Sequence, residues 1–79
     1  MAKSMHYLHM SEINQRFKEA GLGYSLHLNG ACESSEGNLR VETGTQDIAK
    51  AYEIINEVIA KNALHAEADE QDELHILVY

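Results

Sequence analysis

One segment, residues 46–61, carries a wide apolar stripe at helical spacing, and this stripe restricts how the rest of the chain can fold. Its apolar positions are Ile48, Ala51, Tyr52, Ile55, Val58 and Ile59. Asp47 stands in the first turn and Lys61 in the last, where the helix dipole favours these charges. The segment therefore predicts a helix whose wide face needs a broad surface to cover it.

Two further regions alternate between apolar and polar residues, as half-buried strands do. The first region has apolar positions at Tyr24, Leu26, Leu28, Leu39 and Val41. The second surrounds a turn at 69–72 and has apolar positions at Leu64, Ala66, Ala68, Leu74, Ile76 and Val78. Each region predicts an antiparallel hairpin.

The N-terminal region predicts a short strand at 5–9 and a helix at 11–20, with Ser11 as its N-cap and Gly21 as its end. The element order is then β-α-β-β-α-β-β, which is ferredoxin-like with an extra C-terminal strand. We expect a single α+β domain over 1–79, a two-layer sandwich of an antiparallel sheet with two helices on one face. Residues 1–4 are a candidate leader, because Met5 would serve equally well as a start.

Composition excludes several classes of protein. Thirteen acidic against six basic residues give a net charge of −7, which argues against direct binding to nucleic acid. A single cysteine allows neither an internal disulfide framework nor a Cys-rich zinc site, and it favours a reducing cytoplasm. Apolar runs are too short for a membrane span, so we expect a cytoplasmic protein with no membrane partner.

With both helices on one face of the sheet, the other face is open to a partner. Strand alternation places on this face a tentative binding set: His27, Asn29, Arg40, His65, Glu67, His75 and Tyr79. Glu42 and Leu77 share the face by the same alternation. The final strand is expected beside a strand at the edge of the sheet, where unpaired backbone groups invite a second chain, so we expect a homodimer.

The pairing of the last hairpin has two alternatives that fit its short turn. One sets His65 opposite His75, which could share a metal ion or repel when both are protonated. The other sets His75 opposite Glu67 and gives the histidine a carboxylate partner. Zinc sites generally use four ligands, so an ordinary solvated sheet face is favoured over a metal site, and no metal or other cofactor is expected.

The lone cysteine, Cys32, continues the inward positions of its strand and is expected to pack in the core. A catalytic thiolate would need a nearby cation, whereas Glu33 and Glu36 are acidic and His27 lies on the opposite strand face. No residue is therefore predicted to be catalytic, and a Cys-dependent or weakly metal-binding protein is the last alternative.

A cluster of carboxylates is predicted at the tip of the last hairpin: Glu67, Asp69, Glu70, Asp72 and Glu73. A soluble, charged turn accounts for such a cluster. A second interpretation is an acidic inhibitor of the type that phages encode, whose carboxylates imitate the phosphates of nucleic acid and occupy a basic groove.

Several short segments resemble the RDAC family of small uncharacterised bacterial proteins. The similar segments are Ile13-Asn14, Lys18-Glu19-Ala20-Gly21-Leu22 and His27-Leu28-Asn29-Gly30-Ala31-Cys32. Ala31 and Cys32 match the motif that names the family, while Asn29 and Gly30 stand in place of its arginine and aspartate. The resemblance implies an architecture and a bacterial, cytoplasmic origin, and it implies no reaction.

These patterns together predict a small acidic protein that acts without catalysis. It is expected to bind a partner or itself through the open sheet face or the edge strand. A basic protein is the partner that the charge favours.

Overall fold

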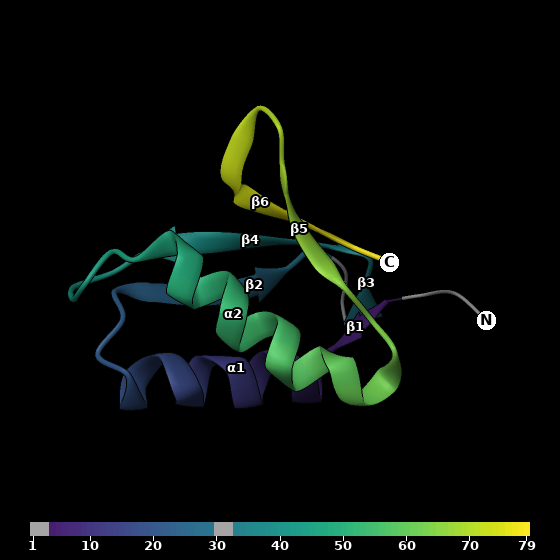
Figure 1. Ribbon diagram of the computed structural model, residues 1–79, viewed down its shortest axis with the longest axis horizontal. Helices are drawn as coiled ribbons and strands as arrows, with labels where there is room; N and C mark the ends of the chain where they lie inside the picture. Colours follow the sequence, from purple (N-terminus) through teal and green to yellow (C-terminus); the bar gives the residue numbers. More distant parts are fainter. Residues whose placement is uncertain (1–3, 30–32) are drawn as a thin grey trace.

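The computed structural model describes residues 4–29 and 33–79 of the chain. Figure 1 shows two helices below and in front of a sheet, with a hairpin that projects away from them. The elements are β1 (Met5–His6), α1 (Tyr7–Glu19), β2 (Tyr24–Leu28), β3 (Glu33–Ser34), β4 (Glu36–Val41), α2 (Ile48–Ile59), the 3-10 helix η1 (Ala60–Asn62), β5 (Ala66–Asp69) and β6 (Asp72–Val78).

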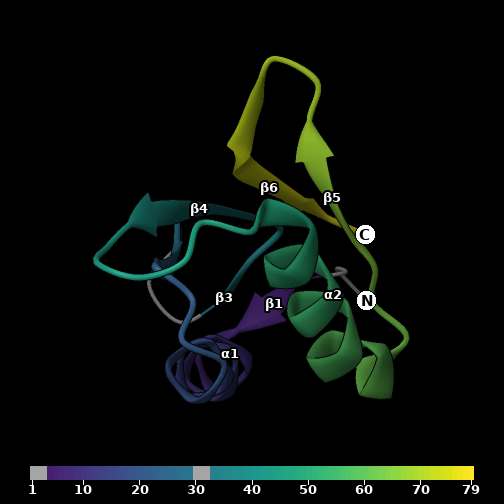
Figure 2. The same ribbon diagram turned by 60° about the vertical axis from the view of Figure 1, so that its left-hand side comes forward.

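The main sheet has four antiparallel strands in the order β2-β4-β6-β5. Both helices lie on the same side of it (Figure 2). This arrangement confirms the predicted α+β two-layer sandwich with a ferredoxin-like order of elements. One strand departs from the expectation, because β1 does not join the main sheet and pairs with the short strand β3.

The core between the layers is entirely apolar within the described residues. The helices contribute Ile13, Phe17, Ala51, Ile54, Ile55, Val58 and Ile59, and the sheet contributes Tyr24, Leu26, Leu39, Ala66, Ile76 and Val78. Burial of a large side chain of this kind contributes about 1.5–3 kcal/mol. The predicted stripe of the second helix and the inward strand positions therefore supply most of the core.

The first helix begins earlier than the sequence predicts. It starts at Tyr7 with His6 as its N-cap, whereas Ser11 lies inside the helix. The Leu8 amide donates to His6 Nδ1 at 3.3 Å, and the His6 amide donates to His9 Nδ1 at 3.0 Å. Two imidazoles thus satisfy amides that usually require Ser, Thr, Asp or Asn, and the predicted strand at 5–9 shortens to two residues.

The predicted helix at 46–61 is helical from Ile48 to Ile59 and continues as η1. Asp47 is its N-cap and accepts a hydrogen bond from the Lys50 amide at 3.1 Å.

The end of the first helix agrees with the prediction, because Gly21 has a φ of 71° and the Leu22 amide bonds the Phe17 carbonyl at 2.9 Å.

The final strand, β6, lies between β4 and the edge strand β5. The edges are β2 and β5. Asn14 of α1 covers the middle of the β2 edge, and Asn56 of α2 covers the first residue of β5. Asn14 bonds the Leu26 amide at 2.6 Å and its carbonyl at 3.1 Å. Asn56 bonds the Ala66 amide at 2.8 Å and its carbonyl at 3.1 Å. At each edge, the amide and carbonyl of one residue are thus bonded and cannot pair with another chain.

Candidate functional site: the open face of the sheet

The face of the sheet opposite the helices, here called the open face, is polar. Its strands contribute Ser25, His27, Glu36, Asn38, Arg40, Glu67, Asp69, His75 and Leu77, and Asn29, His65 and Tyr79 lie next to strand ends. Every residue of the tentative binding set lies here, because the alternation assigns strand faces correctly. Glu42 joins the face through a hydrogen bond from Ser25 at 3.1 Å.

The last hairpin has neither of the two predicted registers. Glu67 pairs with Leu77, and a bulge between Ala68 and Asp69 shortens the turn so that Asp69 pairs with Asp72. His75 is therefore opposite neither His65 nor Glu67. The register that pairs Glu67 with Leu77 and Ala68 with Ile76 places it next to Asp69 instead.

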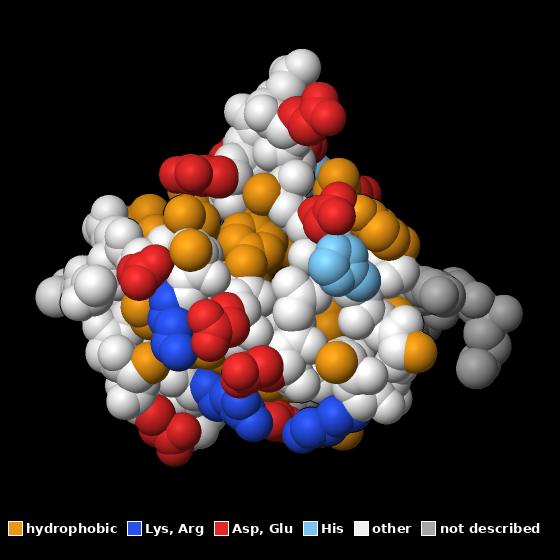
Figure 3. Space-filling view, in the orientation of Figure 1, with side chains coloured by type: hydrophobic (Ala, Val, Ile, Leu, Met, Phe, Trp, Pro, Cys, Tyr) orange, Lys and Arg blue, Asp and Glu red, His pale blue; other side chains and the backbone are white. Residues whose placement is uncertain are grey.

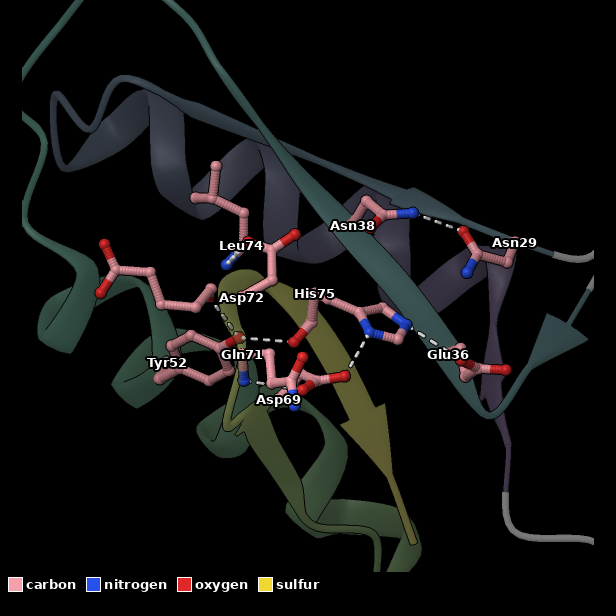
Figure 4. A network of polar contacts seen from close by, with 10 residues as sticks. Asn29, Glu36, Asn38, Tyr52, Asp69, Gln71, Asp72, Leu74 and His75 are labelled. Atoms are coloured by element: carbon pink, nitrogen blue, oxygen red, sulfur yellow. Dashed lines mark hydrogen bonds and ion pairs between the residues drawn. The ribbon is translucent and has the colours of Figure 1, made fainter.

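His75 bridges two carboxylates that come from different strands (Figure 4). Its Nδ1 lies 2.9 Å from Asp69 Oδ2, and its Nε2 lies 2.9 Å from Glu36 Oε1. The contact with Asp69, and then that with Glu36, raises the pKa of His75 above its usual value. The Gln71 amide, and then His75, lowers the pKa of the Asp69 carboxyl. His75 therefore links carboxylates of β4 and β5 across β6, and the links favour its protonated form.

A second cluster fixes another carboxylate at the C-terminal end of the sheet. The Tyr79 hydroxyl donates to Glu67, and His65 Nε2 lies 3.2 Å from Glu67 Oε1. The ring centres of His65 and Tyr79 are 5.7 Å apart. The Tyr79 hydroxyl, and then His65, lowers the pKa of Glu67, while Glu67 raises the pKa of Tyr79. Glu67 is thus ionised and held in one orientation.

The acidic tip is divided between this face and the turn. Glu67 and Asp69 belong to the clusters above, and Asp72 accepts a hydrogen bond from the Leu74 amide at 3.0 Å. Glu70 and Glu73 are exposed. The hairpin is attached to the helical layer by Tyr52, whose hydroxyl donates to the Glu73 carbonyl at 2.9 Å.

Ser25, His27 and Glu42 form a polar chain that the sequence reasoning missed. Ser25 Oγ lies 3.1 Å from His27 Nε2 and donates to Glu42 at 3.1 Å. The Ser25 hydroxyl has a single proton, and it donates this proton to Glu42. His27 therefore does not accept a proton from Ser25, as the histidine of a Ser-His-acid catalytic triad does. The i, i+2 spacing of Ser25 and His27 on one strand face was the available signal.

Charge is distributed unevenly between the two layers. Carboxylates and basic side chains are interleaved over the helices (Figure 3), where Arg16 pairs with Glu57, Lys50 with Glu53 and Lys61 with Glu12. Glu36, Glu67, Asp69, Glu70, Asp72 and Glu73, here called the acidic surface, lie over the β5–β6 half of the sheet and its hairpin tip. Arg40 is the single basic residue among the open-face strand positions.

The structure groups no metal ligands among the residues it describes, His9 has a local role, and Cys32 lies outside the described residues. Within 4–29 and 33–79, no three His, Cys, Asp or Glu side chains are grouped to hold a metal ion. His9 lies 2.8 Å through Nε2 from Asn62 Oδ1, besides capping α1. Cys32 lies outside the described residues, so its predicted place in the core stays a prediction.

Comparisons with protein-family models, curated proteins and solved structures found no match. The resemblance to the RDAC family therefore stays a prediction. In the part of the chain that the structure describes, neither helix is long and apolar enough to cross a membrane.

Proposed function

We propose that the protein acts without catalysis, in the cytoplasm, as a binding module whose acidic surface contacts a basic region of a partner protein. The observation that carries this proposal is the fixed position of three open-face carboxylates. Glu36 and Asp69 are held on either side of His75, and Glu67 is held by Tyr79 and His65.

Fixed carboxylates favour binding because less side-chain freedom is lost when the partner arrives. Ordering a flexible side chain at an interface costs about 0.5–1.5 kcal/mol, and much of this cost is already met within the free protein. The helical carboxylates Glu12, Glu53 and Glu57 are less available to a basic partner, because each already pairs with a lysine or arginine. The acidic surface is thus the part of the molecule that supports recognition of Lys or Arg groups.

A narrower form of the proposal makes the partner a nucleic-acid-binding protein. Carboxylates on both the sheet face and the projecting hairpin could then occupy a groove that normally receives phosphates. Competition by double-stranded DNA distinguishes this form, since DNA should release such a partner and leave any other basic partner bound.

Self-association is a second candidate. Tyr79 is 51% exposed, and together with the half-buried Leu77 it gives the open face an apolar part against which another copy could pack. Pairing of edge strands supports a homodimer less well, because Asn14 and Asn56 already bond backbone groups of one residue on each edge strand. Sedimentation at high salt identifies an apolar dimer, which should persist when charge is screened.

The test uses affinity isolation with the intact chain and two variants of equal charge. The open-face variant carries Glu36→Gln, Glu67→Gln and Asp69→Asn. The matched helix-side variant carries Glu12→Gln, Glu53→Gln and Glu57→Gln. A basic protein should be retained by the wild type and the helix-side variant, lost by the open-face variant, and released by salt.

Equal retention by the two variants would show that the acidic surface is not the contact. Retention of a partner that salt does not release would contradict its electrostatic basis. Circular dichroism of both variants establishes that they are folded before they are compared.

A further inference from the structure

A groove of about 400 Å³ lies along the β2 edge of the sheet, at the edge opposite β5. Helix α1, the α1–β2 connection, strands β2 and β4 and the segment after β4 all contribute to it. The lining residues on which the argument rests are Lys18, Leu22, Tyr24, His27, Arg40 and Glu42. Its volume lies within the range of small-molecule sites, which is about 300–1,000 Å³.

The groove collects the basic groups that no carboxylate neutralises. Of the five basic side chains in the described residues, Arg16, Lys50 and Lys61 form ion pairs. Lys18 and Arg40 have no such partner within 4–29 and 33–79, and both line this groove. They come from different layers, α1 and the sheet, so the fold itself brings two unpaired cations together in a protein of net charge −7.

The remaining lining residues define what the cations could bind. Leu22 and Tyr24 supply an apolar wall and are each 8% exposed. Glu42 is the one carboxylate of the lining, and it accepts the hydrogen bond from Ser25. The guanidinium fork of Arg40 suits a planar carboxylate or a phosphate, and Lys18 adds a second positive charge.

Beside the groove, the α1–β2 connection and the segment after β4 pack closely against each other at glycines. The Gly23 amide bonds the Thr45 carbonyl at 2.7 Å, and the Glu42 amide bonds the Gly23 carbonyl at 2.8 Å. A Cβ on Gly23 would lie 2.8 Å from the Glu42 carbonyl oxygen. The two hydrogen bonds of Gly23 hold the segment that carries Glu42 against the start of β2, so the groove is formed without a ligand.

We propose that this groove binds a small organic anion, with its carboxylate or phosphate group between Lys18 and Arg40 and its apolar part against Leu22 and Tyr24. The site is separate from the acidic surface, and neither proposal depends on the other.

The test is an amide NMR titration of the full chain with phenyl phosphate, benzoate and inorganic phosphate, with benzylamine as the cationic control. We expect either aromatic anion to shift signals of Lys18, residues 22–27 and residues 40–43, and benzylamine to leave them unchanged. A stronger effect of phenyl phosphate assigns the site to phosphates, and a stronger effect of benzoate assigns it to carboxylates. Inorganic phosphate should bind more weakly than phenyl phosphate because it lacks the apolar part.

Three variants separate the groove from a general effect of charge. Lys18→Gln and Arg40→Gln should each weaken binding by about tenfold, as loss of one charge-assisted hydrogen bond predicts. Lys50→Gln makes the same change in net charge on α2 and should bind like the wild type. Glu42→Gln should strengthen binding, because it removes the competing carboxylate from the groove.

Absence of shifts with both aromatic anions would overturn the proposal. So would equal weakening by Lys18→Gln and Lys50→Gln, or equal binding of benzylamine. Lys18 and Arg40 are exposed, so their replacement should leave folding intact, and the amide spectrum itself reports whether it does.

Discussion

The asparagine at the β2 edge provides a quantitative test of how the sheet is closed. Asn14→Ala removes two side-chain hydrogen bonds, of 2.6 Å and 3.1 Å, and leaves the amide and carbonyl of Leu26 without these partners. At about 1 kcal/mol for each bond, the loss is about 2 kcal/mol. Alanine is the better helix former by up to about 0.7 kcal/mol, which reduces the expected loss to about 1.5 kcal/mol.

Urea unfolding followed by circular dichroism measures this loss as a lower midpoint at an unchanged slope. In a domain of this size, about 1.5 kcal/mol corresponds to a melting temperature lower by about 6–12 °C. Gln15→Ala on the same helix is the control, because Gln15 makes one exposed bond of 3.4 Å to Glu19. If Asn14→Ala unfolds at the same urea concentration as Gln15→Ala, the proposed role of Asn14 is refuted.

Three further predictions concern the loops, the hairpin and the bridging histidine. Gly23→Ala should lower the free energy of unfolding by about 1–3 kcal/mol, because its Cβ would lie 2.8 Å from the Glu42 carbonyl oxygen; urea unfolding measures the loss, and an unchanged midpoint would refute it. Burial, then the charges of nearby carboxylates, raises the pKa of Tyr52 to about 12. Its phenolate absorbance should therefore appear well above pH 10, and titration at the usual value would contradict the packing of the hairpin on α2. The pKa of His75 is raised from 6.5, so the stability that it contributes is complete below pH 6.5 and is lost as pH rises through its folded value. NMR of the imidazole should give a midpoint above 6.5 that falls in Asp69→Asn, and an unchanged midpoint in that variant would contradict the bridge.

The parts of the fold that the sequence predicts well are those where one local period decides the outcome. Most of the buried face of α2 and the inward positions of β2 follow from spacing alone, because burial of one face leaves no other arrangement. The predicted stripe omitted Ile54, which is also buried. The start of α1 does not follow from a standard pattern, since His6 and His9 replace the usual N-cap residues. Imidazole caps carry no recognisable sequence signal.

Long-range pairing limits what could be predicted of the candidate site. Alternation correctly assigns His75 to the open face. Its partners depend on the register of β5 with β6, which places Asp69 next to it, and on the pairing of β6 with β4, which brings Glu36 alongside. No hairpin turn joins β4 to β6, so no local turn sets their register or the order of the strands.

The proposal that the acidic surface is the contact region is tested most directly by locating where a basic ligand binds. Amide NMR of the wild-type protein, titrated with a short arginine-rich peptide at low salt, should show shifts centred on Glu36, Glu67, Asp69 and His75. These shifts should disappear in the variant that carries Glu36→Gln, Glu67→Gln and Asp69→Asn, and they should persist when the helix-side carboxylates are neutralised instead. Shifts centred on α1 and α2, or shifts that survive in the open-face variant, would contradict the account.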